Sequence, residues 1–132
     1  MKFTNAISWF EIPATDINRA QQFYEAIFDM KMDAVDHEGY QMRMFPLDDP
    51  MSGVGGAICK QSEFHIPNAE SGTLIYLNAN PDVQIIVDRI EQAGGTIILP
   101  KTEISPEYGY MAVFLDTEGS RIALHSVPEK YL

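Results

Sequence analysis

The chain of 132 residues is 45% hydrophobic and 21% charged, and its formal net charge is −10. This length allows one domain with its own core, while the shortage of Lys and Arg argues against a nucleic acid partner. No apolar run approaches the roughly 18 residues of a membrane helix, so we expect no membrane partner. The single cysteine, Cys59, and the lack of a signal-peptide pattern at the N-terminus indicate a cytoplasmic protein.

The first half is predicted to contain a strand, a helix and three more strands. Residues 7–12 are rich in β-branched and aromatic side chains, which is typical of a strand, and Pro13 is expected to end it. Thr15 or Asp16 can cap the helix that follows. Its buried stripe is predicted from the spacing of Ile17, Ala20, Phe23, Tyr24 and Ile27. The three later strands are expected over residues 30–34, 39–45 and 54–59.

The second half is predicted to repeat this order after a polar linker at about residues 61–71. A strand over residues 73–78 precedes a helix that we expect to begin at Asn80-Pro81, where a capping side chain is followed by proline at the first helical position. Gly94-Gly95 would end that helix. The remaining strands are expected over residues 96–99, 110–115 and 121–125.

The chain therefore reads as two copies of one βαβββ unit. The helix cues Asp16-Ile17 and Asp82-Val83 lie 66 residues apart, and the pairs Gly39-Tyr40 and Gly109-Tyr110 lie 70 apart. We expect one α+β domain over residues 1–132, with modules at about 5–60 and 72–127. Two such modules would combine curved sheets around a ligand cavity.

Four segments carry a resemblance to a known family. They are residues 10–13 with 16–24, residues 72–77, residues 90–95, and residues 114–119 with 122–124. On them the chain resembles the vicinal oxygen chelate superfamily, which includes glyoxalase I, extradiol dioxygenases, and the bleomycin- and fosfomycin-resistance proteins. The resemblance implies paired βαβββ modules in a U-shaped half-barrel. It also implies a homodimer in which two chains build sites between modules.

The resemblance further implies a divalent metal held by His, Glu or Gln from four strands, a ligand set that suits nickel, zinc, iron or manganese. The matching positions here are Ile7 or Ser8, one of Gly55-Gly56-Ala57, Thr73 or Leu74, and Ala123. None is a good ligand, so we predict no metal and no other cofactor. The divalent metal remains the alternative. A nonstandard site built on Glu11 and His125 would have only His65 as an obvious third ligand.

Strand alternation predicts a ligand cavity with aromatic walls and a few polar anchors. On the third strand, either Gln41 and Arg43 or Met42 and Met44 point inward. The predicted ligand-binding residues are Trp9, Glu11, Arg43, Tyr76, Asn78, Tyr110, Arg121 and His125.

Three of these residues have alternative interpretations. Glu11 could be a catalytic base or an anchor for a cation, or it could form a salt bridge with Arg43 or Arg121. His125 could be an acid–base group, or an edge-strand side chain bonded to backbone. Trp9 could stack on a ligand or belong to the core.

These residues favour a protein that binds a small organic molecule in an aromatic-lined cavity without the usual metal. Two alternatives remain open. One is a metal-dependent glyoxalase-like lyase or isomerase, or a dioxygenase, in which the metal would bind vicinal oxygens or stabilise an enediolate. The other is a non-catalytic accessory module with a vestigial cavity.

Overall fold

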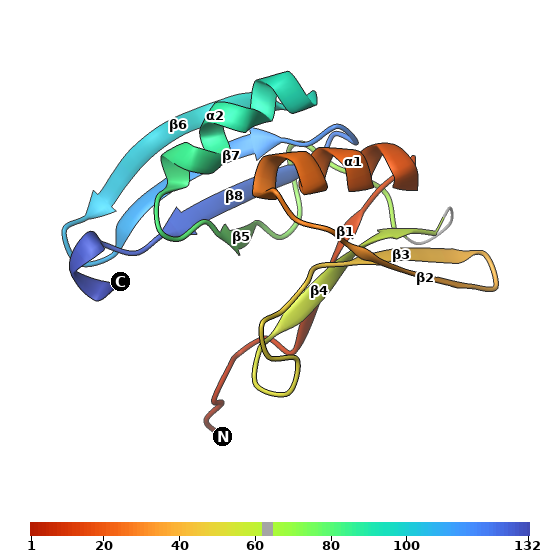
Figure 1. Cartoon of the computed structure of the whole chain (residues 1–132), viewed down its shortest axis with the longest axis horizontal. Coiled ribbons are helices and arrows are strands. Elements are labelled where there is room, and N and C mark those ends of the chain that lie inside the picture. The colour runs from red at the N-terminus through yellow and green to blue at the C-terminus, as the bar shows by residue number, and fades with distance from the viewer. Residues whose placement is uncertain (62–64) are drawn as a thin grey trace.

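A computed structural model describes residues 1–61 and 65–132, and it contains two four-stranded sheets, each with one long helix (Figure 1). The first module contains β1 Trp9–Pro13, α1 Ile17–Phe28, β2 Asp33–His37, β3 Tyr40–Met44 and β4 Gly55–Lys60. The second contains β5 Ile75–Asn78, α2 Val83–Ala93, β6 Thr96–Ser105, β7 Gly109–Leu115 and β8 Arg121–Ser126. A short 3₁₀ helix, Glu129–Tyr131, follows. The predicted α+β fold of two βαβββ modules is confirmed.

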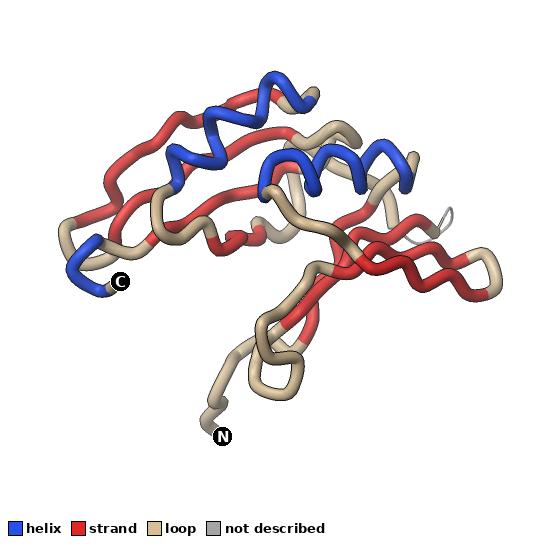
Figure 2. The backbone as a smooth tube through the Cα atoms, in the orientation of Figure 1, coloured by secondary structure: helices blue, strands red, loops and turns tan. Residues whose placement is uncertain are grey.

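The two sheets have the same topology. Their strand orders are β1-β4-β3-β2 and β5-β8-β7-β6. In each sheet the first strand runs parallel to the fourth, while the other pairs are antiparallel. The first strand of each module is therefore a sheet edge. The tube drawing in Figure 2 shows the two helices lying on the same side of the molecule.

Both helices begin at an aspartate cap. The Asp16 carboxylate accepts a hydrogen bond from the Arg19 amide at 3.0 Å, and the Asp82 carboxylate accepts one from the Gln84 amide at 2.9 Å. The predicted start of the second helix at Asn80-Pro81 is therefore wrong by two residues, because Asp82 itself supplies the capping oxygen. Gly94 ends α2 in the left-handed conformation, as the sequence predicted.

Several strand boundaries also differ from the prediction: β1 begins at Trp9 and includes Pro13, and β5 begins at Ile75 rather than at residue 73. β2 begins at Asp33 rather than at residue 30, and β6 extends to Ser105 instead of ending at residue 99. The β6–β7 pairing shifts register at three places, so β6 does not keep the regular alternation by which a strand is recognised. Part of the predicted linker, residues 62–64, lies outside the described residues.

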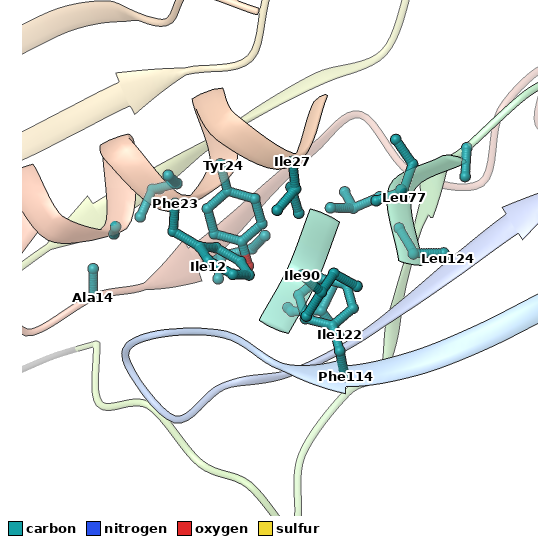
Figure 3. Packing of buried hydrophobic residues seen from close by; sticks show 14 of the residues in the cluster. Ile12, Ala14, Phe23, Tyr24, Ile27, Leu77, Ile90, Phe114, Ile122 and Leu124 are labelled. Carbon is teal, nitrogen blue, oxygen red and sulfur yellow. The ribbon is translucent and has the colours of Figure 1, made fainter. Parts of the chain in front are cut away.

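One hydrophobic core joins the modules, and Figure 3 shows its central side chains. Phe23 and Tyr24 of α1 reach across to the second module. The Phe23 and Phe114 rings lie 5.8 Å apart, and the Tyr24 hydroxyl donates to Asp116 Oδ2 at 2.8 Å. These contacts from α1 join the two modules on the helix side of the sheets. None of the helices in the described part of the chain is long and apolar enough to cross a membrane.

Candidate functional site: a groove between the two modules

The edge strands β1 and β5 border two neighbouring hollows. The larger, here called the chamber, has a volume of about 940 Å³. The smaller, here called the recess, has a volume of about 250 Å³. Thr73 and Ile75 line both hollows, so the two adjoin along the seam between the modules, and together they are here called the groove.

The chamber is mainly apolar. Its aromatic walls are Phe10 and Phe45, whose rings lie 5.5 Å apart, together with Phe28 from the end of α1. Tyr76, with half of its surface exposed, lines it from the β5 side. The other lining residues include the polar Asp48, Asn78 and Asn80. An apolar cavity of this size with a few polar groups is the usual form of a small-molecule site.

The recess lies between the other end of β1 and the start of β8. Among the described residues, Glu11 and Arg121 are its charged lining residues, and the hydroxyl-bearing Ser71 and Thr73 also line it. It differs from the chamber because it carries opposite charges and several hydrogen-bonding side chains. One end of the groove is thus polar and the other apolar.

Glu11 is held by two side chains of the first module and one of the linker. Its Oε1 accepts a hydrogen bond from the Tyr40 hydroxyl at 2.7 Å and lies 2.6 Å from His65 Nε2, while Trp9 Nε1 donates to Oε2 at 3.1 Å. Burial acts to raise the pKa of Glu11, but these bonds outweigh it and hold the pKa below the ordinary value. Neither arginine expected to pair with Glu11 does so. A carboxylate with a lowered pKa is a weaker base, so the arrangement favours an anchoring role.

Trp9 and Glu11 share one side of β1 because they are two residues apart. Trp9 is 39% exposed, so it is not part of the core. Tyr40, which sequence reasoning did not single out, joins them from β3. Met42 and Met44 lie on the same side of the sheet as Glu11. Because Tyr40 is two residues before Met42, strand alternation could have placed it on this side too.

In the second module the expected residues are on the side of the sheet away from α2. Tyr76 pairs with Ala123, and Asn78 pairs with His125, in the parallel β5–β8 register. His125 Nε2 lies 2.7 Å from the backbone oxygen of Tyr108, which agrees with its interpretation as a side chain bonded to backbone. However, β8 is an interior strand rather than an edge strand.

The structure does not bring Arg43 to this side of the first sheet. Arg43 is buried beneath α1, where its Nε donates to Gln21 Oε1 at 2.7 Å and its Nη1 to Asp36 Oδ1 at 3.0 Å. Met42 and Met44 therefore point to the side of Glu11. This resolves the register of the third strand that the sequence left open.

Tyr110 also lies apart from the groove. It packs against the helix-side core, as its two-residue spacing from Ala112 and Phe114 requires. The Lys101 ammonium stands 4.4 Å from the centre of its ring and 2.9 Å from Asp82 Oδ1. Tyr110, Lys101 and Asp82 line a separate hollow of about 540 Å³.

Cys59 lies fully buried in β4, on the same side as Glu11 and Tyr40. Burial, followed by the charge of Glu11, raises the pKa of the Cys59 thiol to about 12. A thiol in this state is not a nucleophile at neutral pH. Cys59 therefore contributes packing to the site.

Sequence comparison assigns the family. A profile of the Glyoxalase/Bleomycin resistance protein/Dioxygenase superfamily matches residues 6–124. The chain belongs to this superfamily. A glyoxylase-like domain-containing protein from Didymella fabae is 30% identical over 127 residues, which cover 94% of this chain and 95% of that protein.

Solved structures of the superfamily share the fold. A glyoxylase/bleomycin resistance protein/dioxygenase domain from Frankia sp. EAN1pec has a TM-score of 0.71 and 14% identity, covering 95% of this chain and 99% of its own. The trypanothione-dependent glyoxalase I of Leishmania major has a TM-score of 0.66 and 20% identity, covering 97% and 89%. At these identities the likeness concerns the fold alone.

The superfamily implies a metal, but the residues at its expected positions do not fit one. Ala57 and Ala123 are fully buried alanines, and a side chain at Gly56 would overlap the ring of Phe10. Within residues 1–61 and 65–132, no three His, Cys, Asp or Glu side chains are grouped closely enough to hold a metal ion. His65 does lie beside Glu11, but His125 is engaged with Tyr108 instead.

The chamber's phenylalanines are the main residues that sequence reasoning missed. Phe10 and Phe45 lie on the helix side of their strands, and that side is normally assigned wholly to the core. They reach the groove because the two sheets separate at β1 and β5. Nothing local in the sequence marks that separation.

Proposed function

We propose that this superfamily member binds a small, mainly apolar organic molecule in the groove between its modules, without a metal. The chamber carries the proposal. Its size matches that of small-molecule sites, and its walls combine Phe10, Phe28 and Phe45 with the polar Asn78 and Asn80. Sequestration of a ligand needs only such a cavity, whereas the superfamily's metal chemistry needs ligands that the corresponding positions do not supply.

The test is a fluorescence titration with N-phenyl-1-naphthylamine, an uncharged dye that brightens in apolar surroundings. Wild-type protein should bind it with a dissociation constant of the order of micromolar, and Thr73→Trp should weaken binding at least about tenfold by filling the groove. Thr96→Trp is the matched control, because it makes the same change at an exposed position on β6.

Two outcomes would refute the proposal. One is the absence of binding by wild-type protein, and the other is equal binding by Thr73→Trp. Thermal unfolding with and without the dye provides an independent readout, because a ligand that binds only the native state raises the unfolding temperature.

Assembly as a cytoplasmic homodimer remains a proposal as well. Apolar side chains near the groove are exposed, including Ile7 and Tyr76 at 50% each and Ile66 at 73%. A second copy of the chain could cover them. Light scattering that returned the mass of one chain at micromolar concentration would refute the dimer.

A further inference from the structure

Two of the four arginines, Arg89 and Arg121, have no carboxylate partner among the described residues. The Arg19 and Arg43 guanidinium groups each pair with a carboxylate, at 2.6 Å from Glu118 and 3.0 Å from Asp36. The salt bridges of the described residues do not include Arg121. Its contacts are backbone oxygens of the chain before β5, at 3.5 Å from Glu70 and 3.3 Å from Gly72.

These contacts leave the guanidinium incompletely satisfied. Both distances exceed the 2.9 to 3.0 Å typical of N–H···O hydrogen bonds. The Nε atom is buried and has no hydrogen-bond partner within residues 1–61 and 65–132. A buried donor without a partner costs free energy unless something else accepts its hydrogen bond. The Nε–H group of Arg121 therefore lacks an acceptor among the described residues.

The surroundings of Arg121 suit a carboxylate. The guanidinium fork matches the two oxygens of that group, and Ser71 and Thr73 bring hydroxyl donors to the same recess. Glu11, the other charged lining residue among those described, already accepts hydrogen bonds from Trp9 and Tyr40, and its Oε1 lies 2.6 Å from His65 Nε2. Glu11 is thus engaged by side chains of the protein, whereas Arg121 has no carboxylate partner among the described residues.

We propose that the recess binds the carboxylate of a ligand whose apolar body occupies the chamber, with Arg121 as the recognising residue. This inference rests on the proposed function and specifies its ligand class: an apolar molecule that ends in a carboxylate. The two hollows adjoin at Thr73 and Ile75, so the proposed ligand would extend past these two residues. The recess of about 250 Å³ has room for a terminal group.

Calorimetric titration with two probes of the same shape tests the inference. 4-Phenylbutyrate is an anion at neutral pH, and 4-phenylbutanamide is neutral. Wild-type protein should bind the carboxylate at least about tenfold more tightly, since charge-assisted hydrogen bonds discriminate by this much or more. Arg121→Gln should remove the preference while leaving the affinity for the amide unchanged.

Arg89→Gln is the matched control. It removes the same charge from α2, where Arg89 Nη1 contacts the backbone oxygen of Ile27 and no described carboxylate. The control should keep the full preference for the carboxylate. If Arg121→Gln does not fold, the Nε–H resonance of Arg121 in wild-type protein replaces it. That resonance should shift with 4-phenylbutyrate and not with the amide.

The outcomes separate the two proposals. Equal affinity for both probes in wild-type protein, or a preference that survives Arg121→Gln, overturns the carboxylate site and leaves the apolar groove standing. No binding of either probe, together with no binding of the naphthylamine dye, overturns both. A carboxylate preference that depends on Arg121, without dye binding, supports the recess and contradicts the chamber.

Discussion

At the scale of single residues, Glu118 shows how one buried carboxylate fixes the module junction. Its side chain is fully buried, and it accepts bonds from the amides of Thr15 and Asp16 at 2.9 and 2.6 Å. Arg19 Nε adds a charge-assisted bond at 2.6 Å. Burial acts to raise the pKa of Glu118, but the bond from Arg19 and the amide bonds outweigh it and hold the pKa at about 2. The turn after β7 is thereby tied to the start of α1.

The lowered pKa sets the pH dependence of stability. Above pH 4.5, the ordinary pKa of the group, Glu118 is ionised in both states and its contribution is complete; as the pH falls toward 2 the contribution is lost. Glu118→Gln should lower the free energy of unfolding by about 2 to 3 kcal/mol at pH 7, with the gap from wild type shrinking below about pH 4.5. Urea unfolding at several pH values measures it, with exposed Glu103→Gln as the control. If the difference in the free energy of unfolding between wild type and Glu118→Gln did not change with pH, the low pKa of Glu118 would be contradicted.

The residue scale is also where sequence reasoning about the site failed most clearly. β3 places Met42 and Met44 on one side and Gln41 and Arg43 on the other, but alternation does not tell which of the two sides α1 covers. The partners that bury Arg43 are Gln21 on α1 and Asp36 on β2. A charged residue becomes a buried one only through such contacts, and their formation depends on the tertiary fold.

At the scale of elements, the turn from β6 into β7 depends on a glycine. Gly109 has φ of +91°, a conformation that side chains disfavour. A Cβ atom at this position would also overlap the backbone oxygen of Ser126 at the end of β8. Position 109 therefore requires glycine for two separate reasons: the positive φ of the turn, and the close approach of β7 to the end of β8.

Gly72 allows these reasons to be separated. It has φ of +92°, but a Cβ atom there would meet nothing within 4 Å. Gly72→Ala should cost about 1 to 2 kcal/mol from backbone strain alone, and Gly109→Ala at least about 2 kcal/mol more, because the strands must move apart. Denaturant midpoints of the two variants test the difference. Equal losses would show that the backbone contact at Gly109 yields without cost.

Elements were more predictable than the site because their signals are local. The α1 stripe of Ile17, Ala20, Phe23, Tyr24 and Ile27 is buried as its spacing predicted. Errors came where two local signals competed. Asn80-Pro81 and Asp82 both resemble a helix start, and the structure uses the second. The predicted β6 was too short, because register shifts in its pairing with β7 interrupt the side-chain alternation on which the prediction depended.

At the scale of the whole molecule, the repeat in the sequence becomes two sheets that share one core and part at their edge strands. The modules and their order follow from the sequence. The groove does not follow from the sequence, because its shape depends on the distance between β1 and β5 after α1 and α2 have packed together. Of the residues expected to bind ligand, Tyr76 and Asn78 line the chamber, Glu11 and Arg121 line the recess, and Trp9 supports Glu11.

The most direct measurement is the affinity of the naphthylamine dye for protein expressed with nickel, zinc, iron and manganese available, with metal content determined on the same sample before and after chelation. We expect less than about a tenth of an equivalent of metal and the same dissociation constant in both samples, since the proposed binding free energy comes from the apolar groove. Near-stoichiometric metal whose removal abolishes dye binding would contradict a metal-free groove.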